Sequence, residues 1–331
     1  MRIFFPFNCL LIITAFSLSL SASLVSAQDK APAIATLHQV EGNVEVVTAK
    51  SPRGRRGNDG MLLHAGDQVR TSEESKATVE YRDGSRVRLF QNSEIVLNLS
   101  EEQSTSRRTF KYQLTLKRGS LRGRFLKGLQ RTKIRTPTAL IGVKGTSLRI
   151  TDNNNNATVS LTEGQLEVSN LSSSTILNPG QWLPDFGRTD DLTKKVGPIP
   201  NLLYLKTDVY ELDFRNEKSK QLEFSVQIQN NVSGKILERS GLVLFESDYN
   251  GIRLPKRFLL NEKGFARVLV GIDPTRLEDP GFKGLITIRA FMDGEGFDDI
   301  AEGSLVLKIR NLGKKRTILL DPDKGVVKKN D

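Results

Sequence analysis

Residues 77–89 read Ala77-Thr78-Val79-Glu80-Tyr81-Arg82-Asp83-Gly84-Ser85-Arg86-Val87-Arg88-Leu89. Apolar side chains alternate with polar ones on both sides of Asp83-Gly84, a dipeptide typical of a two-residue β-turn. Because successive side chains of a strand point to opposite faces, the stretch predicts a hairpin. One face, predicted to point into a core, carries Val79, Tyr81, Val87 and Leu89. The other face, predicted to point to water, carries Thr78, Glu80, Arg86 and Arg88.

The same alternation continues along the chain and predicts an all-β protein. In the first half, the inward rows are Phe110, Tyr112, Leu114 and Leu116, then Leu148 and Ile150, then Val159 and Leu161. In the second half, Leu222, Phe224, Val226 and Ile228 alternate with polar residues. Further strands are predicted at Gly241–Glu246, Arg257–Leu260, Phe265–Val270, Leu285–Phe291 and Leu305–Ile309. About seven short strands over roughly 110 residues are typical of an immunoglobulin-like β-sandwich. One turn of helix is predicted at Phe125–Gln130.

These patterns predict a five-part organisation. A signal peptide occupies residues 1–27, a first β-domain residues 34–185, a linker residues 186–201, an immunoglobulin-like sandwich residues 202–312, and a charged tail residues 313–331. The linker is inferred from the polar composition between Pro184 and Pro200, which predicts few contacts between the two domains.

The N-terminus predicts export. Arg2 precedes an apolar run diluted by serine and threonine, and Val25-Ser26-Ala27 has the small-x-small form of a cleavage site. Cleavage after Ala27 would remove Cys9, the single cysteine of the chain. No later apolar run is long enough for a transmembrane helix. An exported chain without disulfides is typical of a bacterial periplasm or cell surface.

An ordered series of short motifs in the first domain is similar to the FecR family of periplasmic domains. The motifs are Val40–Val44, Leu63–Thr71, Asp83–Ser85, Leu116–Gly119, Ile134–Thr146, Val159–Val168 and Leu177–Gln181. Most of these residues have a structural explanation. Glycine allows turns, and Asp67 suits an Asx-type turn with the backbone amides that follow it. Pro137 lacks the N–H needed for a hydrogen bond in the ladder between two strands. The residues assigned this role are Gly66, Asp67, Gly84, Gly119, Pro137, Gly145, Thr146, Gly164 and Gly180.

The resemblance implies a regulator that contacts an outer-membrane receptor. Such regulators carry a cytoplasmic segment that binds a sigma factor, followed by a transmembrane helix. This sequence differs in three respects. Nothing precedes the apolar run except Met1–Phe7, so no cytoplasmic anti-sigma segment is expected, and the run has the features of a cleavable signal. The C-terminal half resembles a bacterial immunoglobulin-like module. The regulatory role is therefore not carried over directly.

No catalytic residue, metal site or cofactor is predicted. His38 and His64 are the only histidines, and His64 is expected on a turn. Cation sites were considered at Asp152–Asn156 and Asp293–Asp299, but both favour strand-connecting loops. A carboxylate pair for glycoside hydrolysis stays open as an alternative, because acidic residues are numerous.

The most suggestive functional feature is a run of eleven cationic residues without an acid between residues 107 and 135, in a chain of net charge +11. Arg122 and Arg124 are two residues apart, so both are expected to point away from the inward Leu121 and Phe125. This predicts a surface for anionic envelope polymers, with solubility as the competing explanation. The candidate residues are Arg107, Arg108, Lys111, Lys117, Arg118, Arg122, Arg124, Lys127 and Arg131.

The sequence therefore predicts a non-catalytic exported envelope protein that binds or scaffolds, with envelope proteins or anionic polymers as partners and no specific nucleic acid. The alternative is a sensor that contacts an outer-membrane receptor without a cytoplasmic anti-sigma segment.

Overall fold

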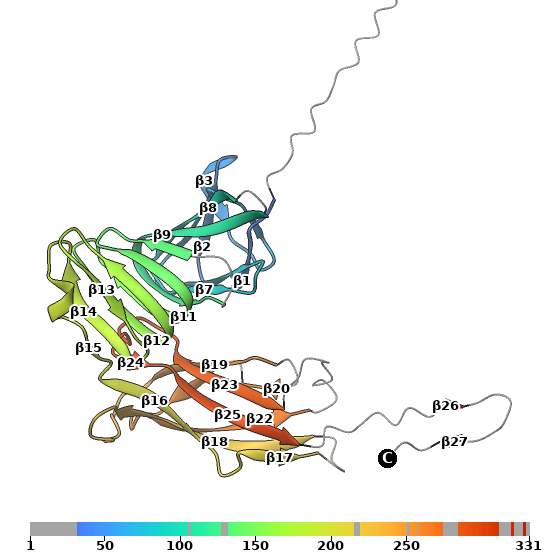
Figure 1. Ribbon diagram of the computed structural model, residues 1–331. Coiled ribbons are helices and arrows are strands. Elements are labelled where there is room, and N and C mark those ends of the chain that lie inside the picture. Colours follow the sequence, from blue (N-terminus) through green and yellow to red (C-terminus); the bar gives the residue numbers. More distant parts are fainter. Residues whose placement is uncertain are drawn as a thin grey trace, which may run out of the picture. The chain divides into compact units, whose positions relative to one another are not determined.

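A computed structural model describes residues 32–104, 107–126, 132–214, 219–249, 252–255, 257–273, 284–310, 319–320 and 327–328. The predicted signal peptide and most of the charged tail lie outside these residues. Ala33–Asp331 forms one compact unit, within which the first domain and a β-sandwich each have their own sheets (Figure 1).

The first domain is one large sheet, with fifteen strands among the described residues. Its strands are β1 (Ala35–Glu41), β2 (Val44–Thr48), β3 (Ser51–Arg56), β4 (Leu62–Leu63), β5 (Gln68–Thr71), β6 (Lys76–Tyr81), β7 (Arg86–Leu89), β8 (Glu94–Ser104), β9 (Arg107–Arg124), β10 (Thr132–Arg135), β11 (Leu140–Asp152), β12 (Asn156–Ser169), β13 (Ser174–Leu177), β14 (Gln181–Gly187) and β15 (Gly197–Pro198). The main path runs in the order β15-β14-β12-β11-β10-β9-β7-β6-β1-β4.

Strand β9 changes neighbours at Gly119, and this change positions the functional site. Up to Arg118 it pairs with β8, and beyond Gly119 it pairs with β7 on one side and β11 on the other. Gly119 has a positive φ of 91°, and a Cβ there would lie 2.6 Å from the Cα of Ser93. Only glycine allows both the left-handed backbone and this close approach. The two halves of β9 therefore present their outward side chains to different surroundings.

Where their side chains are described, the inward rows predicted for the first domain form its core, whereas the side chains of Phe110 and Tyr112 lie outside the described residues. Val79, Val87, Leu89 and Leu116 are fully buried, and Tyr81 is nearly so. The β6–β7 hairpin closes through Asp83, whose Oδ1 accepts from the amide of Ser85. The hairpin predicted from residues 77–89 is confirmed.

The second domain is a β-sandwich of two five-stranded sheets. One sheet has the order β20-β22-β18-β16-β24, with β16 (Asn201–Lys206), β18 (Lys220–Asn230), β20 (Ile252–Arg253), β22 (Phe265–Ile272) and β24 (Ile300–Ala301). The other has the order β17-β25-β23-β19-β21, with β17 (Glu211–Asp213), β19 (Gly241–Ser247), β21 (Phe258–Leu260), β23 (Leu285–Met292) and β25 (Gly303–Arg310). A separate pair, β26 (Leu319–Leu320) and β27 (Val327–Lys328), follows. The sandwich core contains the predicted row Leu222, Phe224, Val226 and Ile228.

The segment expected to be a linker is instead packed against the first domain. Leu192, in the short 3-10 helix η1 (Leu192–Lys194), is fully buried in the first core, and its amide donates to Ser173 Oγ at 2.9 Å. Strand β15 pairs with β14, and Ile199 is also buried. The polar composition of this segment gave no sign that Leu192 and Ile199 would be buried. The first domain therefore extends to about Pro198.

Two further predictions, the helical turn at Phe125–Gln130 and the water-facing side of the hairpin, differ from the structure where it describes them. Phe125 and Leu126 are not helical, and the remainder of the predicted turn, residues 127–130, is not described. Thr78 and Arg88 do not face water, because both are buried: Thr78 donates to Gln39 of its own domain, and Arg88 donates to Asp293 of the sandwich. In the described part of the chain, no helix has the length and hydropathy needed to cross a bilayer.

Candidate functional site

Three arginines stand side by side on adjacent strands of the first sheet. Arg88 on β7 is directly opposite Arg122 on β9, and Arg122 is directly opposite Arg149 on β11. We call these three residues the arginine row. Their neighbours Leu89, Leu121 and Ile150 are buried in the core, so the row points to the opposite face of the sheet. Like charges directly opposite each other are destabilising, so this row requires counter-charges.

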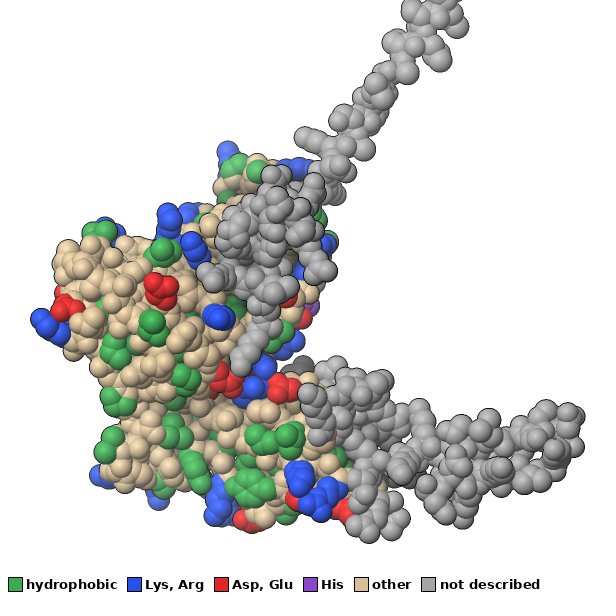
Figure 2. Space-filling view, viewed as in Figure 1, with side chains coloured by type: hydrophobic (Ala, Val, Ile, Leu, Met, Phe, Trp, Pro, Cys, Tyr) green, Lys and Arg blue, Asp and Glu red, His purple; other side chains and the backbone are tan. Residues whose placement is uncertain are grey.

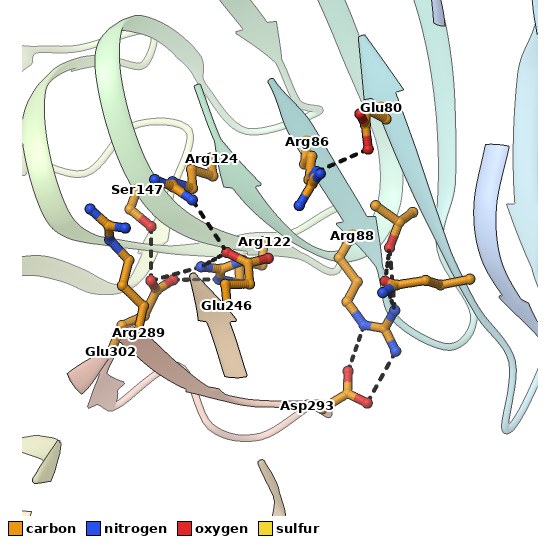
Figure 3. Close-up of polar contacts among 12 residues, drawn as sticks. Glu80, Arg86, Arg88, Arg122, Arg124, Ser147, Glu246, Arg289, Asp293 and Glu302 are labelled. Carbon is orange, nitrogen blue, oxygen red and sulfur yellow. Dashed lines mark hydrogen bonds and ion pairs between the residues drawn. The ribbon is translucent and has the colours of Figure 1, made fainter. Parts of the chain in front are cut away.

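The sandwich supplies those counter-charges and buries the row. Arg88, Arg122 and Arg149 are only 4%, 3% and 7% exposed. Figure 2 shows acidic and basic side chains next to one another where the first domain meets the sandwich. Figure 3 shows the individual pairs, with Glu246, Asp293 and Glu302 of the sandwich directed at Arg88 and Arg122.

Arg122 binds two carboxylates at once. Its Nε and Nη2 donate to Glu302 at 2.5 and 2.8 Å, and its Nη1 and Nη2 donate to Glu246 at 3.1 and 3.3 Å. The guanidinium also lies 3.6 Å from the ring centroid of Phe291. Burial lowers the pKa of Arg122, but Glu246 and Glu302 outweigh burial and hold the pKa above its ordinary value. Arg122 is therefore permanently charged and fully occupied.

Arg88 and Lys76 share one buried carboxylate. Arg88 Nε and Nη2 donate to Asp293 at 2.6 and 3.1 Å, and Lys76 Nζ donates to the same carboxylate at 3.0 Å. Burial raises the pKa of Asp293, but Arg88 and Lys76 outweigh burial and hold the pKa below its ordinary value. Asp293 is thus an ion-pair partner of two cations of the first domain.

Arg149 is held mainly by backbone oxygens of the sandwich. Its Nη1 and Nη2 donate to the carbonyls of Gly294 and Met292, both at 2.6 Å, and its guanidinium lies over the ring of Phe90. Burial lowers the pKa of Arg149 from its ordinary value. This arginine fixes the loop that begins at Asp293 against the first sheet.

Further pairs surround the row. Arg124 donates to Asp248 at 2.7 Å, and Thr151 donates to Asp298 at 2.8 Å. The opposite polarity also occurs, because sandwich Arg289 donates to Glu163 of the first domain at 2.8 Å. Charged pairs of both polarities therefore join the two domains.

A cleft of about 650 Å³ opens beside the row, between the two domains. Its first-domain wall is polar and includes Gln39, Thr78 and Arg86. Its sandwich wall is more apolar and includes Leu244, Ile252, Leu254 and Pro255.

The structure divides the predicted cationic surface into separate parts. Arg122 and Arg124 point away from the core as expected, but they face the sandwich and not solvent. Lys117 and Arg118 remain exposed, at 46% and 60% of their side-chain areas. The side chains of Arg107, Arg108 and Lys111, and the whole of Lys127 and Arg131, lie outside the described part. Strand β9 has eighteen residues, roughly 55 Å along its length, so its ends do not form one patch.

A second row of charged residues lies on the half of the sheet that the sandwich does not cover. Charges alternate in sign across five adjacent strands, where each residue is directly opposite the next. This charge-alternating row consists of Arg56, Glu45, Arg70, Glu94 and Arg118. Lys117 joins it by an ion pair with Glu94 at 3.1 Å. Here the counter-charges come from the sheet itself, whereas the arginine row depends on the sandwich.

The motif residues assigned a structural role lie at turns and close contacts. Gly66, Gly84, Gly119, Gly145, Gly164 and Gly180 all have positive φ. Asp67 accepts from the amide of His64, three residues earlier, so its turn precedes it rather than following it as expected. Pro137 lies in the turn between β10 and β11, where Thr136 Oγ1 accepts from the amides of Thr138 and Ala139. Thr146 is buried.

Sequence reasoning missed the acidic partners and two members of the row. Arg88 was assigned to water, Arg149 was not singled out, and Glu246, Asp248 and Glu302 gave no local signal. The loop Asp293–Asp299 was considered for a cation and assigned to a strand connection, without its contact with the first sheet. Asp152 closes the β11–β12 hairpin, where it accepts from the amides of Thr138 and Asn154.

The chain is thus an all-β protein with a large sheet domain and a β-sandwich. Residues 67–167, which lie within the first domain, match the family described as FecR protein. The three arginines of the row all lie within the matched residues.

The comparison with curated proteins gave no match. Among solved structures, two from Parabacteroides distasonis, of a protein described as a candidate anti-sigma factor, resemble this fold distantly. They are 16% and 15% identical, with TM-scores of 0.31 and 0.30. Each alignment covers 51% of this chain and 57% of the other, so this chain spans little more than half the length of those proteins.

Proposed function

We propose that this chain is a non-catalytic, exported signalling component of the bacterial envelope, whose FecR-type domain contacts a protein of the outer membrane. The observation that carries the proposal is the family match over residues 67–167. That range runs from the turn before β5 into β12. It includes the whole arginine row, and Arg118 of the charge-alternating row.

The contact between the domains supports a signalling role physically. A ligand shifts an equilibrium between two arrangements only by its differential affinity for them. Because Arg122 and Arg88 join the FecR-type domain to the sandwich through specific pairs, a partner that binds one domain can change the position of the other.

Export is part of the proposal and has its own test. The small residues before Gln28 predict cleavage after Ala27. N-terminal sequencing of protein from the envelope fraction should begin at Gln28 or within a few residues. An intact Met1 in a membrane pellet would contradict export with cleavage.

The signalling role is tested by deleting the gene in its own bacterium and sequencing the transcripts. We expect a defined set of transcripts to change and to return on complementation with the full chain. A photo-crosslinking residue at exposed Ile176 should also capture an outer-membrane protein in the wild-type strain. An unchanged transcript profile, with no outer-membrane crosslink, would contradict the proposal.

Direct binding of an anionic envelope polymer is the second candidate, favoured by one observation. Arg70, Lys117 and Arg118 surround the single carboxylate of Glu94, which leaves an excess of exposed positive charge. Retention on immobilised lipopolysaccharide should fall when Lys117 and Arg118 are changed to Gln. Changing the exposed Lys144 and Lys206 to Gln is the control of equal net charge, and equal retention of both variants would reject this candidate.

A further inference from the structure

We propose that the arginine row is a binding surface for an acidic segment of a partner protein, and that the sandwich covers it as an intramolecular competitor. This inference concerns the row itself and goes beyond the signalling role.

The row already shows which chemistry it accepts. Arg88 binds Asp293 with two nitrogen atoms, and Arg122 binds Glu302 in the same way. Two parallel bonds between a planar guanidinium and a carboxylate give geometric selectivity as well as energy. The bound carboxylates come from the polypeptide itself, so the ligand that fits is a segment of Asp and Glu residues.

The sandwich is joined to the row in a way that permits release. The two hydrophobic clusters of the chain share no residue, with the first ending at Leu192 and the second beginning at Leu203 among the described residues. The contact between them includes several ion pairs, whose attraction is offset by the cost of removing both charges from water, and the rings of Phe90 and Phe291, which belong to neither cluster. Polar contacts between domains of one chain resemble transient interfaces.

Without the sandwich, the arginine row would still need anions to offset the repulsion between its three guanidinium groups. The three guanidinium groups lie on neighbouring strands and span about 10 Å, since adjacent strands are about 4.8 Å apart. Their mutual repulsion would no longer be offset by Glu246, Asp293 and Glu302. Two or three carboxylates within that distance on a partner would replace the sandwich.

The test compares three forms of the full chain. The open variant carries Glu246→Gln, Asp293→Asn and Glu302→Gln. The control variant, of identical net charge, carries Glu223→Gln, Glu238→Gln and Glu262→Gln, which are exposed positions elsewhere on the sandwich. Binding of fluorescent poly-L-glutamate is measured by anisotropy at low salt, with circular dichroism to establish folding.

We expect the open variant to bind poly-L-glutamate at least tenfold more tightly than both the wild type and the control variant. Adding Arg122→Gln to the open variant should remove the gain. The milder single change Glu302→Gln should give a smaller gain in the same direction, which keeps the test valid if the triple change unfolds the protein.

Equal binding by the open and control variants would overturn the proposal, because the gain would then come from net charge alone. Tighter binding of polyphosphate than of poly-L-glutamate by the open variant would overturn the assignment of an acidic polypeptide.

Discussion

Arg122 and Glu302 are 180 residues apart in the sequence and form a two-pronged ion pair with nitrogen–oxygen distances of 2.5 and 2.8 Å. The same guanidinium binds Glu246, so the positive charge at this position of β9 is neutralised entirely from the sandwich. Only four residues earlier, Arg118 is neutralised by Glu94 of its own sheet. Gly119, between them, is where β9 changes neighbours.

Changing Arg122 to Ala should strongly destabilise the protein. Removing one partner of a buried ion pair leaves uncompensated charges, here Glu246 and Glu302, and costs about 3–5 kcal/mol. The matched control is Arg118→Ala, whose exposed pair with Glu94 should contribute about 0–1 kcal/mol. Urea unfolding followed by the fluorescence of Trp182, the only tryptophan, measures both. Equal losses for the two variants would contradict this account.

Acid should weaken the docking of the domains. The pKa values of Glu246, Asp248 and Asp293 lie below their ordinary values, because the arginine partners outweigh burial. A carboxylate whose folded pKa lies below its unfolded pKa stabilises the fold above the unfolded value, about 4, and loses this contribution as pH falls through the folded value. The thermal midpoint should therefore fall progressively below about pH 4. A Glu246→Gln, Asp293→Asn variant should show a shallower fall, and parallel curves would reject the explanation.

Leu192 should contribute to the core of the first domain. Truncating a fully buried leucine costs about 2–5 kcal/mol, so Leu192→Ala should lower the urea midpoint reported by Trp182. Lys194→Ala, two residues away and 81% exposed, should leave it nearly unchanged. A free linker would predict no effect from either change.

Residues 202–312 should fold without the first domain, because their hydrophobic cluster is separate. The isolated piece should give a β-type circular dichroism spectrum and a cooperative thermal transition. A broad melt would show that the sandwich depends on the arginine row for its structure.

The alternation of apolar residues was sufficient to predict many of the longer strands, but not short ones such as β15, β17 and β24. The predicted strand at Gly241–Glu246 is observed as β19, one residue longer, and the one at Leu285–Phe291 is β23, also one residue longer. A period of two is a local property, so a single sequence reveals it. The linker prediction was wrong for a related reason, because isolated anchors such as Leu192 have no period to reveal them.

The candidate site was predicted only in part. The alternation correctly placed Arg122 and Arg124 on the face opposite Leu121, but it could not indicate what covers that face. The covering residues, Glu246 and Glu302, lie 124 and 180 residues further along the chain. Their contact depends on how the two domains meet, which no local pattern specifies.

The dependence of the arginine row on the sandwich has a consequence for the order of synthesis. At about 5–20 residues per second, the ribosome adds Glu302 roughly 10–40 s after Arg122. During this interval the arginine row has no Glu302 carboxylate beside it. The arginine row of the first domain therefore receives all of its ion-pair partners only after the last part of the sandwich has been synthesised.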